Sequence, residues 1–345
     1  MMEKWYEVPE SLDSCVIYSK VRLVRNWSEY PFPDKMTREQ SMELTARILG
    51  GLQNIGNTDG KAYRCSYLHQ MSDLDKAVYV ERKVLNRGII KKKDVGGLVL
   101  SEDERIGITI NGDDHVRIQI LEKGLNLAEN YKKANEIDDY IGESIEYAFD
   151  EKYGYLTTFP TNVGTGLRAS VILHLPMLSR KKNFNSLVAD MGRFGTTIRG
   201  VYGEGSENYG SLYRVSNQKT LGQTEKDIID LVGKAATELA LQERRLRREA
   251  LKHHAVSCAD EAYKSYGVLK YARRLSRKDS MEFLSQLMFG ISTGIIETKE
   301  PCSVYELMLG TQTANLLIHA DRPLNKEEVD EARAVYLREH LPEIR

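Results

Sequence analysis

Five basic residues stand where the chain could turn them toward an anion. Lys20, Arg22, Arg117, Arg168 and Arg199 lie beside predicted strand ends or loops. Taken singly, each is more typical of a solvated surface charge. If the fold brings them together, their cationic groups match the oxygens of a nucleotide triphosphate, because a guanidinium offers a planar fork of donors. The chain has no Walker-type lysine loop, kinase glycine loop or dinucleotide-binding fingerprint that would supply another phosphate site.

Acidic residues accompany this basic set at two places. Asp113 and Asp114 follow Asn111 and Gly112, two residues that favour a tight turn with positive φ. From the residues alone, the two aspartates read as the polar tip of a hairpin. Glu204 lies in a loop rich in glycine and polar residues, 203–210. Such a loop is either mobile or ordered by a ligand.

The elements that must position these residues follow from periodicity. Thr37 and Gln40 have the spacing of a capping box and predict a short helix that stops at the glycines 50–51. Alternating isoleucines predict an antiparallel hairpin over 106–120. Apolar residues at intervals of three or four predict a helix over 125–147, and a strand is expected over 167–175.

Helical periodicity dominates the second part of the chain. Thr224 and Asp227 predict the start of a long helix that reaches about residue 254, and everything after 255 reads as α-helical. We therefore expect an α+β domain over 1–254, an antiparallel sheet flanked by helices, followed by an all-α domain over 255–345. The cluster Arg244, Arg245, Arg247 and Arg248 is interleaved with glutamates, so it reads as a solvated helix face.

Composition excludes several classes of function. The 49 basic and 50 acidic residues leave a formal net charge of −1, so no global field would attract nucleic acid or an anionic membrane. No apolar run suits a bilayer span or a signal peptide, which favours a cytoplasmic protein. The single cysteines at 15, 65, 258 and 302 lack metal-ligand spacing and read as reduced thiols. His115 and His174 have no matching ligand set, and no metal site is expected.

Four segments of the chain can be compared with known families: 19–26 (SKVRLVRN), 111–117 (NGDDHVR), 160–170 (PTNVGTGLRAS) and 199–207 (RGVYGEGSE). They stand in the order found in the phosphagen kinases, the ATP:guanido phosphotransferase superfamily. The chain resembles that superfamily, and within it the bacterial protein-arginine kinases of the McsB type, which also carry a tail similar to 263–269 (YKSYGVL).

The resemblance implies a role for each candidate residue. Arg22, Arg117, Arg168 and Arg199 would bind the phosphates of ATP, with Lys20 where the family normally has arginine. Glu204 would clamp the substrate guanidinium. Asp113 would orient that group and remove a proton as its nitrogen attacks the γ-phosphoryl group, with Mg²⁺ bridging the phosphates. We expect the chain to lack the N-terminal helical domain of creatine and arginine kinases. This expectation favours, as substrate, an arginine presented on a protein.

Several positions depart from the family pattern. The motif Asn-Glu-Glu-Asp-His reads 111–115 (NGDDH) here, so the base at Asp113 is one methylene shorter. The family cysteine before the Pro-Thr-Asn segment is replaced by Phe159, which is either a core residue or part of a changed pocket. In the tail, an Arg-Asp-x-x-Arg-Ala motif that receives phosphoarginine becomes 329–334 (VDEARA), and Asp330 and Arg333 are equally consistent with an exposed helix pair.

Two main hypotheses follow. The first is an active ATP-dependent protein-arginine kinase; the second is a catalytically weak or inactive nucleotide-binding adaptor, motivated by the departures at Lys20, Gly112, Asp113 and Phe159. A kinase for free arginine or another small guanidine is disfavoured. The resemblance implies protein substrates with exposed arginine, an McsA-like activator, Clp protease components and a heat-shock repressor as partners, and the helical tail could support a homodimer.

Overall fold

The computed structural model describes residues 3–143, 145–203 and 208–345. Packing divides them into two compact units that interleave along the chain. Of the described residues, unit 1 comprises those within 3–5, 18–170 and 216–233, and unit 2 those within 6–17, 171–203, 208–215 and 234–345. These units do not follow the 254/255 boundary expected from the sequence, and that boundary stays a prediction.

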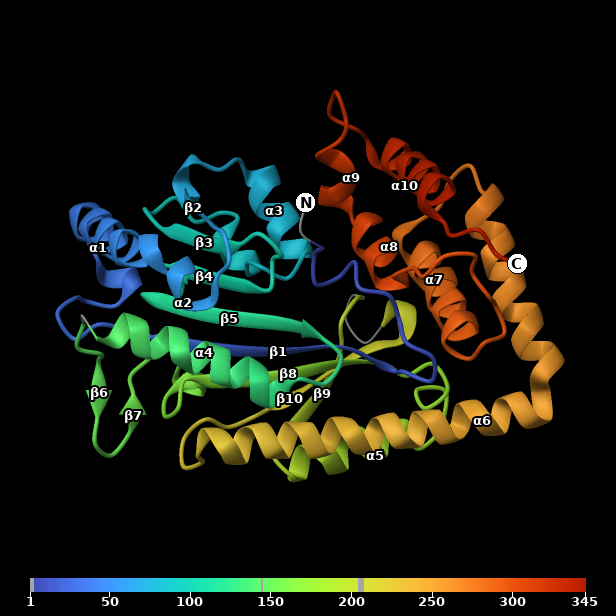
Figure 1. The fold of residues 1–345 in the computed structure, drawn as a ribbon, viewed down its shortest axis with the longest axis horizontal. Coiled ribbons are helices and arrows are strands. Elements are labelled where there is room, and N and C mark those ends of the chain that lie inside the picture. The colour runs from blue at the N-terminus through green and yellow to red at the C-terminus, as the bar shows by residue number, and fades with distance from the viewer. Residues whose placement is uncertain (1–2, 144, 204–207) are drawn as a thin grey trace. The chain divides into compact units, whose positions relative to one another are not determined.

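Unit 1 is built on an antiparallel sheet (Figure 1) whose strands run in the order β2-β3-β4-β5-β1 and continue into the first half of β8. Each pair has a continuous register, for example Ile110 opposite Val116 in the β4–β5 hairpin. The elements of unit 1 are β1 (Val16–Arg25), α1 (Arg38–Gly51), α2 (Gly56–Asp59), β2 (Tyr63–Tyr67), α3 (Asp73–Glu81), β3 (Gly97–Ser101), β4 (Ile106–Ile110), β5 (Val116–Lys123), α4 (Leu127–Gly142), β6 (Phe149–Asp150), β7 (Gly154–Tyr155) and β8 (Leu167–His174).

Helix α4 covers one face of this sheet and thereby fixes where the basic residues point. Asn130 of α4 donates to the hydroxyl of Ser19 on β1, and Arg25 pairs with Asp138 at 2.6 Å. Because successive strand side chains alternate between faces, Ser19 and Arg25 face α4, whereas Arg22 of β1 faces the opposite side. The register Arg22–Gln119 and Val24–Arg117 places Arg117 of β5 on that same opposite face.

Unit 2 has the strand order β8-β10-β9, with α5 packed on β9, and a group of helices. Helix α6 continues beyond the predicted end at 254, where His254 has non-helical angles (φ −137°, ψ 32°) and the helix kinks. The elements of unit 2 are α5 (Phe184–Arg193), β9 (Thr196–Gly200), β10 (Leu212–Asn217), α6 (Glu225–Tyr271, shared with unit 1), α7 (Arg277–Ser292), α8 (Val304–Gly310), α9 (Thr313–Leu317) and α10 (Lys326–His340).

Most predicted elements are confirmed. The capping box of Thr37 and Gln40 is formed, with hydrogen bonds in both directions, and Thr224 and Asp227 cap α6 in the same way. Residues 255–345 are helical apart from turns and one isolated bridge between Thr298 and Ile344. The predicted helix over 125–147 ends at Gly142 instead. The α+β class, with an antiparallel sheet flanked by helices and a helical C-terminal part, is confirmed.

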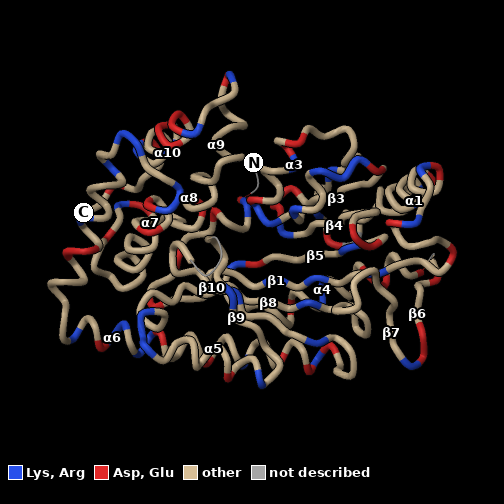
Figure 2. Tube along the Cα trace, turned by 180° about the vertical axis from the view of Figure 1, so that it is seen from behind, with Lys and Arg blue, Asp and Glu red and all other residues tan. Residues whose placement is uncertain are grey.

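The described residues of the chain contain no helix that is both long and apolar enough to span a membrane. Acidic and basic residues, red and blue in Figure 2, are both scattered over the trace, as expected from the balanced composition.

Two sequence interpretations of charged helix residues fail: the solvated helix face holds for the exposed Arg245 and Arg248 but not for Arg247, and Asp330 and Arg333 are no exposed pair. Arg247 is 1% exposed and lies in no solvated face: its Nε donates to the equally buried Glu243 at 2.9 Å, and its Nη2 donates to the carbonyl of His174. Arg333 is likewise 1% exposed, so it forms no exposed pair with Asp330. It donates to the carbonyls of Thr311 and Leu275. Both arginines therefore tie together separate helices or loops within unit 2.

Candidate functional site

Three of the predicted cations gather in unit 1. Arg22 is half-buried on β1, and its pKa is lowered to about 9, first by burial and then by the charges of Arg117 and Arg168. Asp114 and Asp113 act in the opposite direction on the same group. These mutual effects indicate that three guanidinium groups and two carboxylates lie close enough to influence one another's charge.

The guanidinium groups of Arg22 and Arg117 keep donors that no protein acceptor uses. Arg22 donates from Nη2 to the Oδ1 of Asn162 at 2.9 Å, and Arg117 donates from Nη2 to Gln119 at 3.2 Å. The Nε of each is buried without a hydrogen-bond partner in the described part of the chain. Burial also lowers the pKa of Arg117. These two cations, with the charge of Arg168 beside them, form an environment that a polyanion would stabilise.

The loop 160–166 contacts Arg22, and Asn217 at the end of β10 contacts Arg168. Asn162, which is 5% exposed, presents its Oδ1 to Arg22. Gly164 has φ +110°, and a Cβ there would lie 2.4 Å from the carbonyl oxygen of Thr220. Only glycine fits this close backbone approach. Arg168 donates to the carbonyl of Asn217, whose side chain in turn accepts from the backbone N–H of Ala169 at 2.9 Å.

The loop 111–115 is not the simple polar hairpin tip that the residues alone suggested. Asp114 is 2% exposed, and its Oδ1 accepts from the Nδ2 of Asn26 at 2.7 Å and from the backbone N–H of Thr158 at 2.8 Å. Asn111 has φ +50°, as predicted, whereas Gly112 is not among the positive-φ residues. The loop spans five residues between Ile110 and Val116 and is therefore longer than a tight two-residue turn.

His115 stabilises this loop as a neutral imidazole. Its Nδ1 accepts the backbone N–H of Trp27 at 3.0 Å, so its Nε2 carries the proton and donates to the carbonyl of Pro31 at 2.9 Å. Burial lowers the pKa of His115 to about 4. His115 therefore has a structural role.

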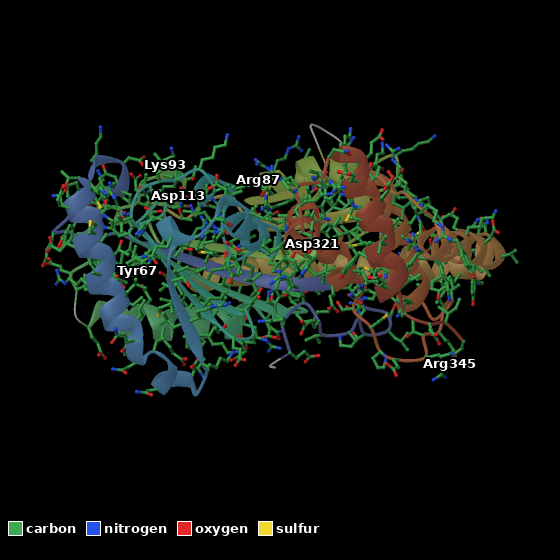
Figure 3. All side chains as sticks on the ribbon, turned by 90° about the horizontal axis from the view of Figure 1, so that it is seen from above. Tyr67, Arg87, Lys93, Asp113, Asp321 and Arg345 are labelled. Atoms are coloured by element: carbon green, nitrogen blue, oxygen red, sulfur yellow. The ribbon has the colours of Figure 1, made fainter. Side chains whose placement is uncertain are left out.

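Asp113 is the more accessible carboxylate of the pair and is labelled in Figure 3. Its Oδ2 accepts from the Nδ2 of Asn86 at 2.6 Å. The negative charge of Asp113 acts to raise the pKa of both Arg22 and Arg117, against the effect of burial. A carboxylate therefore stands beside the cations, in the arrangement expected for a group that faces a guanidinium next to a triphosphate.

The remaining predicted residues are placed less completely. Lys20 is half-buried on β1, two residues before Arg22 and on the same face of the sheet. Arg199 is exposed on β9 in unit 2. Glu204 lies outside the described residues. Phe159 is 49% exposed, which rules out the core residue among its two interpretations.

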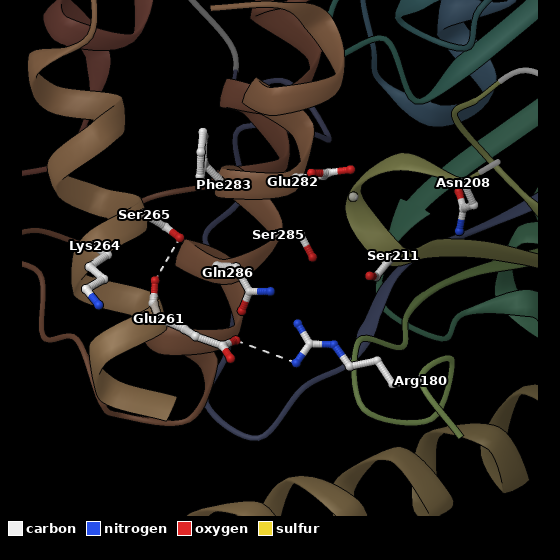
Figure 4. A pocket seen from close by; sticks show the side chains of 11 residues that line it. Arg180, Asn208, Ser211, Glu261, Lys264, Ser265, Glu282, Phe283, Ser285 and Gln286 are labelled. Atoms are coloured by element: carbon white, nitrogen blue, oxygen red, sulfur yellow. Dashed lines mark hydrogen bonds and ion pairs between the residues drawn. The ribbon is translucent and has the colours of Figure 1, made fainter. Parts of the chain in front are cut away.

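Unit 2 contains a cavity of its own, of about 470 Å³, between α6, α7 and the segment 208–211 (Figure 4). Two cations line it, but each has a carboxylate partner. Arg180 pairs with Glu261 at 3.5 Å, and Lys264 pairs with Asp260 at 2.6 Å. Because these charges are compensated, we assign no anion site there.

Sequence reasoning missed the asparagines of unit 1. Asn26, Asn86, Asn162 and Asn217 each hold a loop or a charged group of the site. Asn26 and Asn162 lie within the recognised segments, and this position was the signal that could have found them.

Comparisons with known proteins show the family of this chain. The sequence model of the ATP:guanido phosphotransferase C-terminal catalytic domain matches residues 46–246, and the chain belongs to this family of phosphotransferases. Residues 255–345 match the C-terminal domain of the protein-arginine kinase McsB. The family's phosphoryl donor is ATP.

Relatives of similar length extend over nearly the whole chain. A protein-arginine kinase of Clostridium kluyveri is 37% identical over 341 residues, covering 99% of each chain. A protein-arginine kinase of Brevibacillus brevis is 38% identical, covering 97% of this chain and 93% of that protein.

Among solved structures, the duplicated taurocyamine kinase of Schistosoma mansoni with bound transition-state-analogue components is similar, with a TM-score of 0.60 and 26% identity. The match covers 75% of this chain and 40% of that duplicated chain. Lombricine kinase shares the fold, with a TM-score of 0.59, 22% identity and coverage of 71% and 73%.

Proposed function

We propose that this protein transfers the γ-phosphoryl group of ATP to arginine side chains of protein substrates. The observation that carries the proposal is the gathering of Arg22, Arg117 and Arg168 beside Asp113 in unit 1. The match to the McsB C-terminal domain and the protein-arginine kinases at 37% and 38% identity support a protein-bound arginine over a free guanidine.

Each predicted site residue receives a role in this proposal. Arg22, Arg117 and Arg168 neutralise and align the phosphates, with Lys20 and Arg199 as further phosphate ligands. Glu204 holds the arginine guanidinium of the substrate. Charge neutralisation and alignment are the main requirements, because the protein does little covalent chemistry in phosphoryl transfer.

Asp113 is the proposed proton acceptor. One guanidinium nitrogen of the substrate forms the new bond to the γ-phosphorus, and the bond from that phosphorus to the β–γ bridging oxygen breaks, which releases ADP. The nitrogen loses a proton to the Asp113 carboxylate. A carboxylate is needed because the pKa of a guanidinium lies far above neutral pH, which leaves almost no neutral nucleophile.

Mg²⁺ enters this proposal only as part of the nucleotide complex. The described residues hold no group of three or more His, Cys, Asp or Glu side chains that could bind a metal ion. Mg²⁺ commonly keeps several waters and binds phosphate oxygens in kinase sites, so a nucleotide-borne ion does not require such a group.

Location and partners are further parts of the proposal. Four free cysteines are consistent with a reducing compartment, and we place the protein in the cytoplasm. The proposed partners are protein substrates with exposed arginine, an McsA-like activator and Clp protease components, with a homodimer as the proposed assembly. Native mass spectrometry of the purified protein, alone and with each candidate, tests them.

The direct test incubates the purified protein with Mg-ATP and an arginine-rich protein and detects acid-labile phosphoarginine by mass spectrometry. We expect product with the natural sequence and none with Asp113→Ala. Arg64→Gln is a control, because Arg64 is an exposed arginine on β2 whose guanidinium donates to the hydroxyl of Tyr79. ATP binding without product, even with an activator present, would contradict the proposal and support the adaptor hypothesis.

A further inference from the structure

Asp113 is held by a residue that none of the recognised segments contains. Asn86 lies between α3 and β3, and its Nδ2 donates to the Oδ2 of Asp113 at 2.6 Å. The Oδ1 of Asn86 accepts from the backbone N–H of Ile89 at 3.2 Å. Because the oxygen is used by this backbone donor, the amide cannot flip, and its NH₂ group must face the carboxylate.

The segment that carries Asn86 is anchored in the core. Ile89 is 2% exposed and belongs to a buried apolar cluster with Leu85 and Leu98. Lys92, at the other end of the segment, donates from Nζ to the carbonyl of Gly112 at 2.5 Å. Residues 86–92 therefore contact two consecutive positions of the loop 111–115, and Figure 3 labels Arg87 and Lys93 of the same region.

Glycine at 112 allows this close approach. A Cβ at Gly112 would lie 3.4 Å from the Cδ1 of Ile89 and 3.3 Å from the Cγ2 of Thr109, tighter than most carbon contacts. A larger side chain at 112 would push the segment away and lengthen the contact between Asn86 and Asp113.

We infer that Asn86 is a positioning residue that fixes the Asp113 carboxylate through one oxygen and leaves the other, Oδ1, for the incoming guanidinium. The inference rests on the proposed function. The Asn86 side chain touches neither substrate nor nucleotide in this scheme and acts only through Asp113.

Two substitutions separate this role from the capping role of Asn86. Asn86→Ser keeps an oxygen that can accept from Ile89, but it cannot reach Asp113. We expect kcat to fall by about 10- to 100-fold with an unchanged KM for ATP, because misplacing a reacting group by about 1 Å has an effect of this size. Asn86→Asp also keeps the capping oxygen but places a second carboxylate beside Asp113.

Asn86→Asp should show a signature that loss of folding cannot produce. Two carboxylates at this separation share a proton, so the acidic limb of the kcat/KM profile should move to higher pH by at least about one unit. Activity of Asn86→Asp should therefore recover at alkaline pH, whereas that of Asn86→Ser should not. Wild-type kcat and an unshifted pH profile in both variants would overturn the inference.

A stability measurement decides the contact independently of activity. The exchange Asn86→Asp with Asp113→Asn reverses donor and acceptor, so thermal unfolding of the double variant should recover most of the loss caused by Asn86→Asp alone. Additive losses would overturn the inference. If the unsubstituted protein makes no phosphoarginine, the proposed function fails, and this cycle still decides whether Asn86 holds residue 113.

Discussion

Arg22 illustrates at the scale of a single residue how a site can be built against the stability of the empty protein. Burial and two neighbouring cations lower its pKa to about 9, and its Nε has no acceptor in the described part of the chain. Such a group costs free energy until an anion arrives. The side chain is therefore better explained by ligand binding than by folding.

Replacing Arg22 should weaken ATP binding without lowering the stability of the ligand-free protein. We expect Arg22→Gln to raise the Kd for ATP about 10- to 100-fold, because a charged hydrogen bond contributes about 1.5–3 kcal/mol. Calorimetry measures the affinity, and urea unfolding of the ligand-free variant should show no loss of stability. Arg64→Gln is the control. A variant that binds ATP normally but unfolds more easily would show that Arg22 is structural.

His115 should make stability depend on pH. Its folded pKa of about 4 lies below the ordinary value of 6.5, so between these values the unfolded chain binds the proton and the folded chain does not. The stabilisation is complete above pH 6.5 and is lost as pH falls toward 4. It amounts to an order of 3 kcal/mol. Urea unfolding of His115→Gln between pH 4 and 7 should give a flatter curve than the natural protein; parallel curves would contradict this.

Single charged residues of the site were predictable from the sequence, but their neutral partners were not. Arg22 and Arg117 were expected at a phosphate site because few other residue types bind phosphate this well. Asn86 and Asn217 carry no such signal, since an asparagine in a loop is equally consistent with a turn. The same limit explains Arg247, because its partners Ser14, His174 and Ser292 lie far away in sequence.

At the scale of elements, the loop 160–166 precedes β8 and contacts Arg22 of β1 through Asn162. We expect Gly164→Ala to lower the free energy of unfolding by at least about 2 kcal/mol, because φ is +110° and the added Cβ would meet the Thr220 carbonyl. It should also weaken ATP binding through Asn162. Chemical unfolding and calorimetry measure the two effects.

Gly233 in α6 provides the matched control for this substitution. A Cβ there meets nothing within 4 Å, and no positive φ is involved. Gly233→Ala should raise stability by about 0.5–1 kcal/mol, as expected for a helix interior. Equal effects of the two substitutions would contradict the role assigned to the loop.

Local elements with strong periodicity were predicted well, whereas their ends and turns were not. The β4–β5 hairpin follows from alternating isoleucines, and the start of α1 follows from Thr37 and Gln40. The five-residue loop 111–115 was mistaken for a tight turn. Its shape depends on Asn26 and Thr158, which contact Asp114 from other parts of the chain.

At the scale of the whole molecule, ligand binding should be visible as stability. A nucleotide that binds only the folded chain, at 100 times its Kd, adds about 2.7 kcal/mol to the free energy of unfolding. We expect Mg-ATP to raise the melting temperature of the natural protein and to have a much smaller effect on Arg22→Gln at the same concentration. A shift of equal size in both proteins would place the nucleotide elsewhere.

The double anchoring of Asp114 has a consequence for how this protein can change. Because Asn26 and Thr158 already order the loop, little conformational freedom remains to be lost when reactants arrive. Neighbouring Asp113 sits on a rigid support without being part of it. Position 113 can therefore change from one acidic residue to another with an effect on the reaction rate alone. A substitution at position 114 would instead unfold the loop 111–115 that carries Asp113.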